Sequence, residues 1–333
     1  MNDMTRDTRL IRSAFRPARW LRQRHLQTIF PSLPWAYPHG IELHRRELEL
    51  PDGDATAVDW VARSIEMPAD TPLLVILHGL ESSSESSYAR MLMRAASELG
   101  WRCCVLHFRD CGDYRNRLPR RYHAGETNDI RFFLQTLVDA GNDGPIFAAG
   151  YSLGGNVLLK YLGETAAASP LRAGVAVCVP LDLYKCAQAL DHGFSRVYQR
   201  YLLKSMKASV ARKFNRDTAA FDWERAMNAR TFAEFDDVVT APLHGFAGMS
   251  DYYDRCSSVR FLRDIRVATL IVNAMDDPFM TPDIIPTADE LSDSVTLEVS
   301  DTGGHVGFVE GGTPWRPKYY LPRRVISFLS EQL

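Results

Sequence analysis

Residues 146–156 have the sequence IFAAGYSLGGN, in which a short apolar run leads directly into the pattern Gly-x-Ser-x-Gly. The apolar run predicts a buried strand, and the residues beyond the pattern predict a helix over 153–164. Ser152 then lies in a sharp turn, where Gly150 and Gly154 let strand and helix approach without a clash between side chains. A serine held in such a strained turn is exposed, as a nucleophile must be. The alternative interpretation is that Ser152 is an ordinary serine in a glycine-rich turn.

Short apolar segments alternate with helical ones along most of the chain. This alternation predicts an α/β fold, with a mostly parallel sheet covered by helices on both faces. Eight strands are expected, over Ile41–Leu50, Ala57–Ala62, Leu73–His78, Arg102–His107, Ile146–Ala149, Ala173–Val179, Thr269–Ala274 and Val295–Ser300. Helices are expected over Ser86–Leu99, Thr127–Ala140 and Leu153–Glu164, after Thr281, and at the C-terminal end.

The connection between the sixth and seventh strands is too long for an ordinary crossover. It runs from Leu181 to Gly248, about 70 residues rich in aromatic and helix-forming types. We therefore expect a helical lid insertion over 181–248 that roofs the carboxyl ends of the strands. The α/β core then comprises residues 41–180 and 249–333, and residues 1–40 form an arm packed on this main domain.

Composition narrows the class of protein. The chain has 333 residues, 46% hydrophobic and 24% charged, with a net charge of −2, so it is no polycation and nucleic acid is not an expected partner. No apolar run approaches the roughly 20 residues that span a bilayer, and no secretory signal is recognised, so a cytoplasmic location is expected. The six cysteines show no C-x-x-C pair and are interpreted as packing residues.

Positive charge is concentrated in two segments. The first 24 residues carry +5, residues 195–216 carry +7, and the rest of the chain carries −14. In the second segment, Val197, Tyr201, Met206 and Val210 are expected to form an apolar stripe beside the charges. Peripheral contact with an anionic membrane is one interpretation of this pattern, and a solvated helix face is the other.

A serine hydroxyl needs a base to remove its proton, and the base needs an acid to orient it. In α/β folds with this turn, the three residues follow the order Ser, acid, His. Three histidines follow Ser152, but His192 and His244 fall in the insertion. His305 lies in a glycine-containing loop after the last strand, so it is the expected base.

The acid is expected in the loop after the seventh strand, which reads Asp276-Asp277-Pro278. Asp277 is favoured, because a residue before proline is held extended. Asp276 is interpreted as a cap of the following turn, and Asp182 is a third candidate with an expected structural role. The backbone N–H groups of Leu80 and Leu153 are the expected oxyanion donors.

Several motifs together resemble one known family. They are HGLESS (78–83), GYSLGGN (150–156), NAMDDP (273–278), GGHVGF (303–308), RHLQTIFP (24–31) and YHAGET (122–127). The chain resembles the YheT-like branch of the α/β-hydrolases, which includes predicted bacterial esterases and, more distantly, animal acylglycerol lipases and phospholipases. The resemblance implies an α/β-hydrolase fold in which Ser152, Asp277 and His305 form the catalytic triad. This chain departs from the family pattern at Asp110, because the family usually has Arg-Gly where this chain has Arg109-Asp110.

The expected activity is hydrolysis of carboxylic esters with short to medium acyl chains, through an acyl-enzyme on Ser152. This chemistry requires no cofactor and no metal, and the expected partner is a small-molecule ester. Two alternatives stay open: a lipase or phospholipase that acts at a membrane surface, and a non-catalytic binder on the same scaffold. The sequence does not indicate an oligomeric state.

Overall fold

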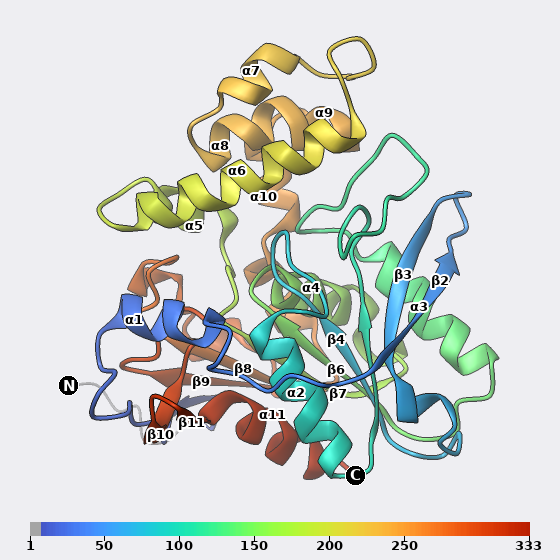
Figure 1. The fold of residues 1–333 in the computed structure, drawn as a ribbon, viewed down its shortest axis with the longest axis vertical. Coiled ribbons are helices and arrows are strands. Elements are labelled where there is room, and N and C mark those ends of the chain that lie inside the picture. Colours follow the sequence, from blue (N-terminus) through green and yellow to red (C-terminus); the bar gives the residue numbers. More distant parts are fainter. Residues whose placement is uncertain (1–7) are drawn as a thin grey trace.

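The computed structural model describes residues 8–333, so Arg6 and the two acids of the basic N-terminal segment, Asp3 and Asp7, lie outside it. A nine-stranded sheet in the order β1-β9-β8-β7-β6-β4-β5-β3-β2 forms the centre of the fold (Figure 1). Strands β1 and β4–β9 run parallel to their neighbours within this group, and β2 and β3 are antiparallel. The strands are β1 (Leu10–Arg12), β2 (Leu43–Glu49), β3 (Ala55–Val61), β4 (Leu73–Leu77), β5 (Arg102–Leu106), β6 (Ile146–Tyr151), β7 (Leu171–Val177), β8 (Ala268–Ala274), β9 (Val295–Ser300), β10 (Val309–Thr313) and β11 (Arg316–Tyr319).

All eight expected strands are present as β2–β9, but the expected total of eight in the sheet is wrong. The ninth strand, β1, has only three residues, the last of which is Arg12, so it shows no periodicity of its own. It forms because β9 offers an open edge, on which Leu10 pairs with Leu297. The hairpin β10–β11 was also not expected, since its two strands contain two glycines and a proline, which are poor strand formers.

The helices cover both faces of the sheet, as expected. In Figure 1, α2 and α11 lie in front of the sheet, and α3 and α4 lie behind it. Within residues 8–333, no helix is long and apolar enough to cross a bilayer. The α-helices are α1 (Arg24–Ile29), α2 (Ser87–Glu98), α3 (Asn128–Asp139), α4 (Leu153–Thr165), α5 (Leu183–Leu190), α6 (Ser195–Lys213), α7 (Trp223–Asn228), α8 (Phe232–Phe235), α9 (Ala241–His244), α10 (Met249–Cys256) and α11 (Tyr320–Ser330).

The helix expected after Thr281 does not form. Only two short 3₁₀ turns occupy this segment, Pro282–Ile284 and Ala288–Glu290. Pro286 lies between them, and a proline there removes a helical hydrogen bond and clashes with the preceding turn. The connection from β8 to β9 therefore has no covering α-helix.

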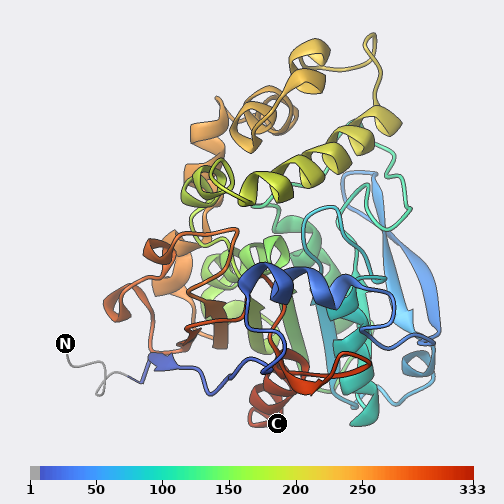
Figure 2. The same ribbon diagram turned by 60° about the vertical axis from the view of Figure 1, so that its left-hand side comes forward.

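Helices α5–α9 form a separate layer above the carboxyl ends of the strands (Figures 1 and 2). We refer to residues 181–248 as the insertion. Its helices pack around their own apolar cluster, which is Leu203, Met206, Val210, Phe214, Ala226, Ala229, Phe235, Val238 and Val239.

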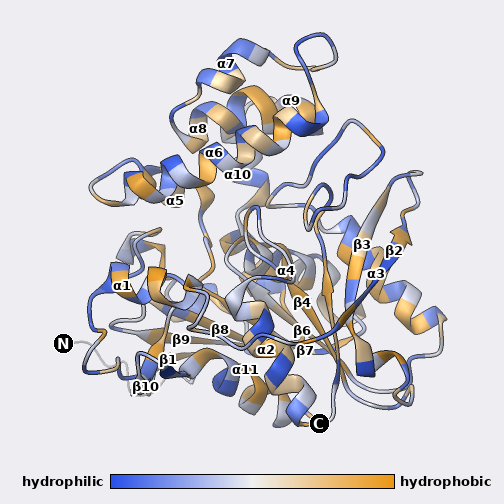
Figure 3. Cartoon of the chain, viewed as in Figure 1, coloured by the Kyte–Doolittle hydropathy of each residue, from blue (hydrophilic) through white to orange (hydrophobic). Residues whose placement is uncertain are grey.

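The apolar stripe expected on α6 does not exist as one face. Val197 and Tyr201 are exposed, whereas Met206 and Val210 are buried in the cluster of the insertion. Met206 is five positions after Tyr201, and at 3.6 residues per turn this spacing places them about 140° apart around the helix, on different faces. Figure 3 shows hydrophilic and hydrophobic residues alternating along α6.

The loop after β5 contains Asp110, at the position where the resemblance to the YheT-like branch implies a glycine. Asp110 adopts a left-handed backbone with φ of 66°. This conformation favours glycine but is tolerated by aspartate. The Asp110 carboxylate lies 3.0 Å from Nε of Arg121, and this buried ion pair ties the loop to the segment before α3.

Candidate active site

The turn between β6 and α4 holds Ser152 in a strained backbone conformation. Its φ is 52° and its ψ is −120°, a region that residues other than glycine rarely adopt. A Cβ atom on Gly150 would lie 2.4 Å from the carbonyl oxygen of Gly154, and one on Gly154 would lie 2.4 Å from that of Leu77. Strand and helix therefore approach as closely as the sequence predicted, and both positions require glycine.

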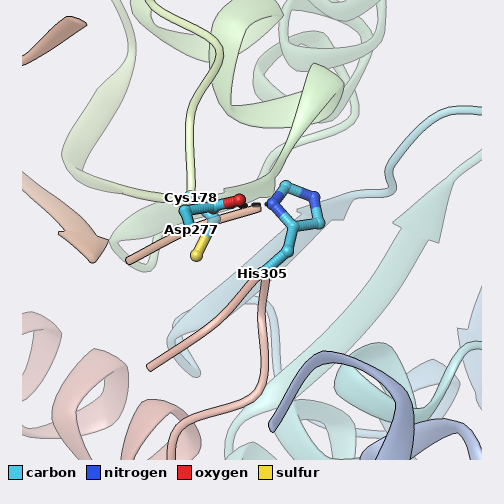
Figure 4. Close-up of side chains that lie close together, drawn as sticks. All are labelled: Cys178, Asp277 and His305. Carbon is cyan, nitrogen blue, oxygen red and sulfur yellow. Dashed lines mark hydrogen bonds and ion pairs between the residues drawn. The ribbon is translucent and has the colours of Figure 1, made fainter. Parts of the chain in front are cut away.

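Three side chains from three different loops meet at this edge of the sheet. His305 Nε2 lies 3.1 Å from Ser152 Oγ, and His305 Nδ1 lies 2.8 Å from Asp277 Oδ2. Figure 4 shows the Asp277 carboxylate facing the imidazole ring, with a dashed line joining them. The Asp277 side chain is 1% exposed and that of His305 is 10% exposed, so both are shielded from bulk water.

Phe279 holds this pair in place. Its ring is stacked on the imidazole of His305, with 4.0 Å between centroids and an interplanar angle of 3°. Its backbone N–H donates a 2.8 Å hydrogen bond to Oδ1 of Asp277, which leaves Oδ2 for the histidine. Both Asp277 and His305 are thus oriented by contacts with Phe279.

The other two candidate acids lie away from the imidazole. Asp276 Oδ1 accepts a 2.9 Å hydrogen bond from the backbone N–H of Gly304, so its carboxylate holds the loop that carries His305. The expectation that it caps the following turn is wrong. Asp182 is the N-cap of α5 and accepts from the Lys185 N–H at 3.1 Å, a structural role as expected.

The two expected oxyanion donors border the same site. Leu80 and Leu153 both line the cavity that contains Ser152. Among residues 8–333, neither backbone N–H donates a hydrogen bond to the protein. Gly79 brings the Leu80 loop close, since a Cβ there would lie only 3.5 Å from Cβ of Ser152. Two unpaired donors next to a serine hydroxyl can stabilise a developing oxyanion.

Two residues that the sequence did not single out position the histidine loop. Thr28 of α1 accepts a 2.9 Å hydrogen bond from the His305 N–H, and Cys178 Sγ accepts one of 3.2 Å from the Val306 N–H. Burial, with Asp277 nearby, raises the pKa of the Cys178 thiol. Thr28 belongs to the RHLQTIFP motif, and this motif was the signal in the sequence that could have pointed to its role. No sequence pattern pointed to Cys178.

Cys178, Asp277 and His305 also place one possible metal-ligand atom each within 4.8 Å of one another. Zinc accepts this donor set in other proteins. Here both histidine nitrogens already bond to Ser152 and Asp277, and a thiol with a raised pKa is a poor source of the thiolate that a metal binds. The arrangement fits proton transfer from the serine better than metal binding.

A cavity of about 130 Å³ lies between the sheet edge and the insertion. Most of its lining is apolar, including Leu202 and Met206 of α6. Asp236 is the acidic lining residue that the insertion contributes: it is buried and accepts hydrogen bonds from the hydroxyls of Thr240, at 2.6 Å, and Tyr253, at 2.7 Å. Burial raises the pKa of Asp236 to about 6.

The sequence matches the family described as "alpha/beta hydrolase fold" over residues 72–312, which is most of the chain. The chain belongs to the α/β-hydrolase family. It is 40% identical over 326 residues to the Escherichia coli (strain K12) protein named "Putative esterase YheT", covering 96% of this chain and 94% of that protein. The resemblance to the YheT-like branch is thereby confirmed.

Other similarities lie within the same family. The mouse protein named "Phospholipase ABHD3" is 28% identical over 317 residues, covering 93% of this hydrolase and 77% of that protein. Among solved structures, the Pyrococcus furiosus esterase Pf2001 superposes with a TM-score of 0.57 at 16% identity, covering 87% of this chain and 93% of that one. The last match supports the fold alone.

Proposed function

We propose that this hydrolase cleaves carboxylic esters of short- to medium-chain acids through an acyl-enzyme on Ser152. The observation that carries the proposal is the continuous relay from Ser152 Oγ to His305 and on to Asp277, at 3.1 and 2.8 Å, beside two unpaired backbone N–H groups. Such an arrangement activates a hydroxyl that is otherwise a weak nucleophile.

In the acylation step, Ser152 Oγ attacks the ester carbonyl carbon while His305 Nε2 takes the hydroxyl proton. The carbonyl oxygen becomes an oxyanion that accepts hydrogen bonds from the N–H groups of Leu80 and Leu153, and each such donor typically lowers the barrier by about 3 kcal/mol. Asp277 holds the imidazole and stabilises its positive charge. His305 then donates the proton to the leaving alcohol, and the acyl group remains on Ser152.

In the deacylation step, a water molecule replaces the alcohol. His305 takes a proton from this water as its oxygen attacks the acyl carbon, and the same two N–H groups bind the second oxyanion. Collapse of the intermediate breaks the bond to Ser152 Oγ, which recovers the proton from His305. The carboxylic acid leaves, and no cofactor takes part.

The preference for a short acyl group rests on the size and lining of the cavity. Its volume of about 130 Å³ is similar to that of apolar protein cavities that hold one benzene-sized molecule. A p-nitrophenyl ester series from acetyl to palmitoyl tests this directly. We expect kcat/KM to peak at four to eight carbons, roughly the range that a cavity of this size fills, and the Ser152→Ala variant to be inactive on all of them.

A lipid ester is the second candidate substrate. It is favoured by the similarity to a protein named as a phospholipase and by the exposed cations on α6. In the same assay, activity only on long-chain or vesicle-bound esters would favour it over the short-chain proposal. Failure to hydrolyse any ester, with a folded protein, would instead favour the non-catalytic binder.

A further inference from the structure

The outer side of α6 carries a row of cations along a surface groove of about 600 Å³. Arg196, Arg200 and Lys204 recur at every fourth residue, so they follow one side of the helix. Lys207 and Arg230 line the same groove. Asp191 is its one acidic lining residue, and it accepts a hydrogen bond from the amide of Gln199.

These cations lack the partners that most other arginines of the protein have. Within residues 8–333, the side chains of Arg196, Arg200, Lys204 and Arg230 make no hydrogen bond or ion pair with the protein. By contrast, Arg109 pairs with three carboxylates, those of Asp52, Asp54 and Asp129. Four unpaired positive charges along one groove create a local field that favours an anionic partner.

A row of exposed apolar side chains runs beside this groove. Val197 and Tyr201, one position after Arg196 and Arg200, are 49% and 74% exposed. Phe194, at the start of the helix, is 51% exposed. Single exposed apolar residues are ordinary, but a contiguous group beside unpaired cations marks an interaction site.

The apolar row continues onto α1. The ring of Phe194 lies 4.4 Å from that of His25, and His25 Nδ1 lies 3.1 Å from the hydroxyl of Tyr198. Next to His25, Leu26 and Ile29 are also exposed. Figure 2 shows α1 lying beneath α6 on the same side of the molecule. The apolar row therefore spans two elements from distant parts of the chain.

We propose that this surface, formed by the exposed residues of α6 and α1, docks onto an anionic phospholipid membrane. The cations contact the headgroups, and the apolar row enters the boundary between headgroups and acyl chains. A soluble polyanion such as nucleic acid would use the cations but leave Val197 and Tyr201 in water. The inference rests on the proposed ester hydrolysis and names the surface at which it takes place, because Leu202 and Met206 of the same helix line the cavity that contains Ser152.

Co-sedimentation of the full chain with vesicles tests the proposal. The probes are vesicles of phosphatidylcholine alone and vesicles with 30% phosphatidylserine. We expect binding to the mixed vesicles at least tenfold tighter than to the neutral ones, and a marked loss of binding in 0.5 M salt, which shortens the screening length. Equal binding to both vesicles, or to neither, overturns the proposal.

Two variants assign the binding to this surface. Each cation near an anionic membrane changes binding by roughly fivefold, so loss of three cations in Arg196→Glu/Arg200→Glu/Lys204→Glu should weaken it by at least about 100-fold, and the three added negative charges weaken it further. Val197→Ser/Tyr201→Ser should weaken it by roughly tenfold. The matched control is Arg46→Glu/Arg94→Glu/Lys318→Glu, three exposed cations elsewhere with the same change in net charge. If the control weakens binding as much as the α6 variant, net charge and not this surface is responsible, and the proposal fails.

The test separates docking from catalysis. Ser152→Ala should bind the mixed vesicles as the unmodified chain does, and the α6 charge variant should hydrolyse a soluble ester at the unmodified rate. Binding without any ester hydrolysis would therefore contradict the proposed function alone. Tight, salt-sensitive binding to duplex DNA with no binding to the mixed vesicles would overturn the membrane proposal in favour of a soluble polyanion.

Discussion

At the carboxyl edge of the sheet, the charged groups of the triad have partners: Asp277 accepts hydrogen bonds from His305 and from the Phe279 N–H. In the insertion the pattern is different. Among residues 8–333, Asp236 is buried without a cation and accepts two hydroxyl hydrogen bonds, while three cations of α6, Arg196, Arg200 and Lys204, stay exposed and unpaired. The two regions face each other across one cavity.

This difference indicates that the two regions have different roles. The groups proposed to carry out the chemistry are fixed by parallel strands that end at one edge, where small errors in position would cost rate. The insertion keeps charged groups without an opposite charge beside them, which are poor for stability but available for binding. Asp236 begins a π-helical turn, Asp236–Thr240, and such turns often mark functional sites. A substitution in one of the two regions should therefore affect a different property from a substitution in the other.

The largest effect is expected at the sheet edge. Asp277→Asn should lower kcat on the best p-nitrophenyl ester by about 10⁴-fold, because an amide no longer holds the imidazole in the tautomer that accepts the serine proton. The neighbouring Asp276→Asn keeps an oxygen that can accept from the Gly304 N–H. It should stay within tenfold of the unmodified rate, as steady-state kinetics on purified variants would show. Equal losses for the two would mean that the acid has been assigned wrongly.

The second prediction concerns stability of the insertion as a function of pH. The pKa of Asp236 is about 6 in the folded protein against 3.8 for an exposed carboxyl, so between these values the folded state binds the additional proton. Stability must then fall as pH rises through this window, by up to about 3 kcal/mol. Asp236→Asn cannot ionise and should lose this dependence.

Urea unfolding at pH 4 and pH 8 measures this effect. Relative to the unmodified chain, Asp236→Asn should gain stability on going from pH 4 to pH 8. Asp237→Asn is the matched control, because Asp237 is half exposed in the same turn. Parallel pH profiles for Asp236→Asn and the unmodified chain would show that the buried carboxyl is not a source of instability.

The smallest effect is expected on acyl-chain preference. Leu202 lines the cavity, so Leu202→Trp should reduce the room for the acyl chain. We expect kcat/KM for an octanoyl ester to fall roughly tenfold relative to an acetyl ester, since single methylenes in such pockets are worth about 1–3 kcal/mol. Ala208→Trp, at an exposed position of the same helix, should leave the ratio of kcat/KM for the octanoyl ester to that for the acetyl ester unchanged. An unchanged ratio in both variants would place the acyl chain elsewhere.

The sequence predicted the sheet edge well for physical reasons. Buried parallel strands are uninterrupted apolar runs, and the turn at Ser152 needs glycines at fixed positions, so both leave local signals. His305 could be chosen because the competing histidines fall in the insertion. The ninth strand was missed because three residues are too few to show periodicity; it forms by pairing with β9, a tertiary effect.

The insertion was harder to predict. Its overall helical character was visible from composition, but the assignment of Val197, Tyr201, Met206 and Val210 to one stripe ignored the helical repeat. The supporting contacts of Thr28 and Cys178 with the histidine loop join residues that are far apart in the chain. No local pattern can indicate such contacts, and they became visible only in the folded structure.

The central claim is that Ser152 is an activated nucleophile. Labelling with a fluorophosphonate probe tests it without any assumption about the substrate. We predict one adduct by intact mass, mapped to the peptide that contains Ser152 and absent from the Ser152→Ala variant. No adduct on the folded protein, or an adduct that persists in Ser152→Ala, would contradict the account.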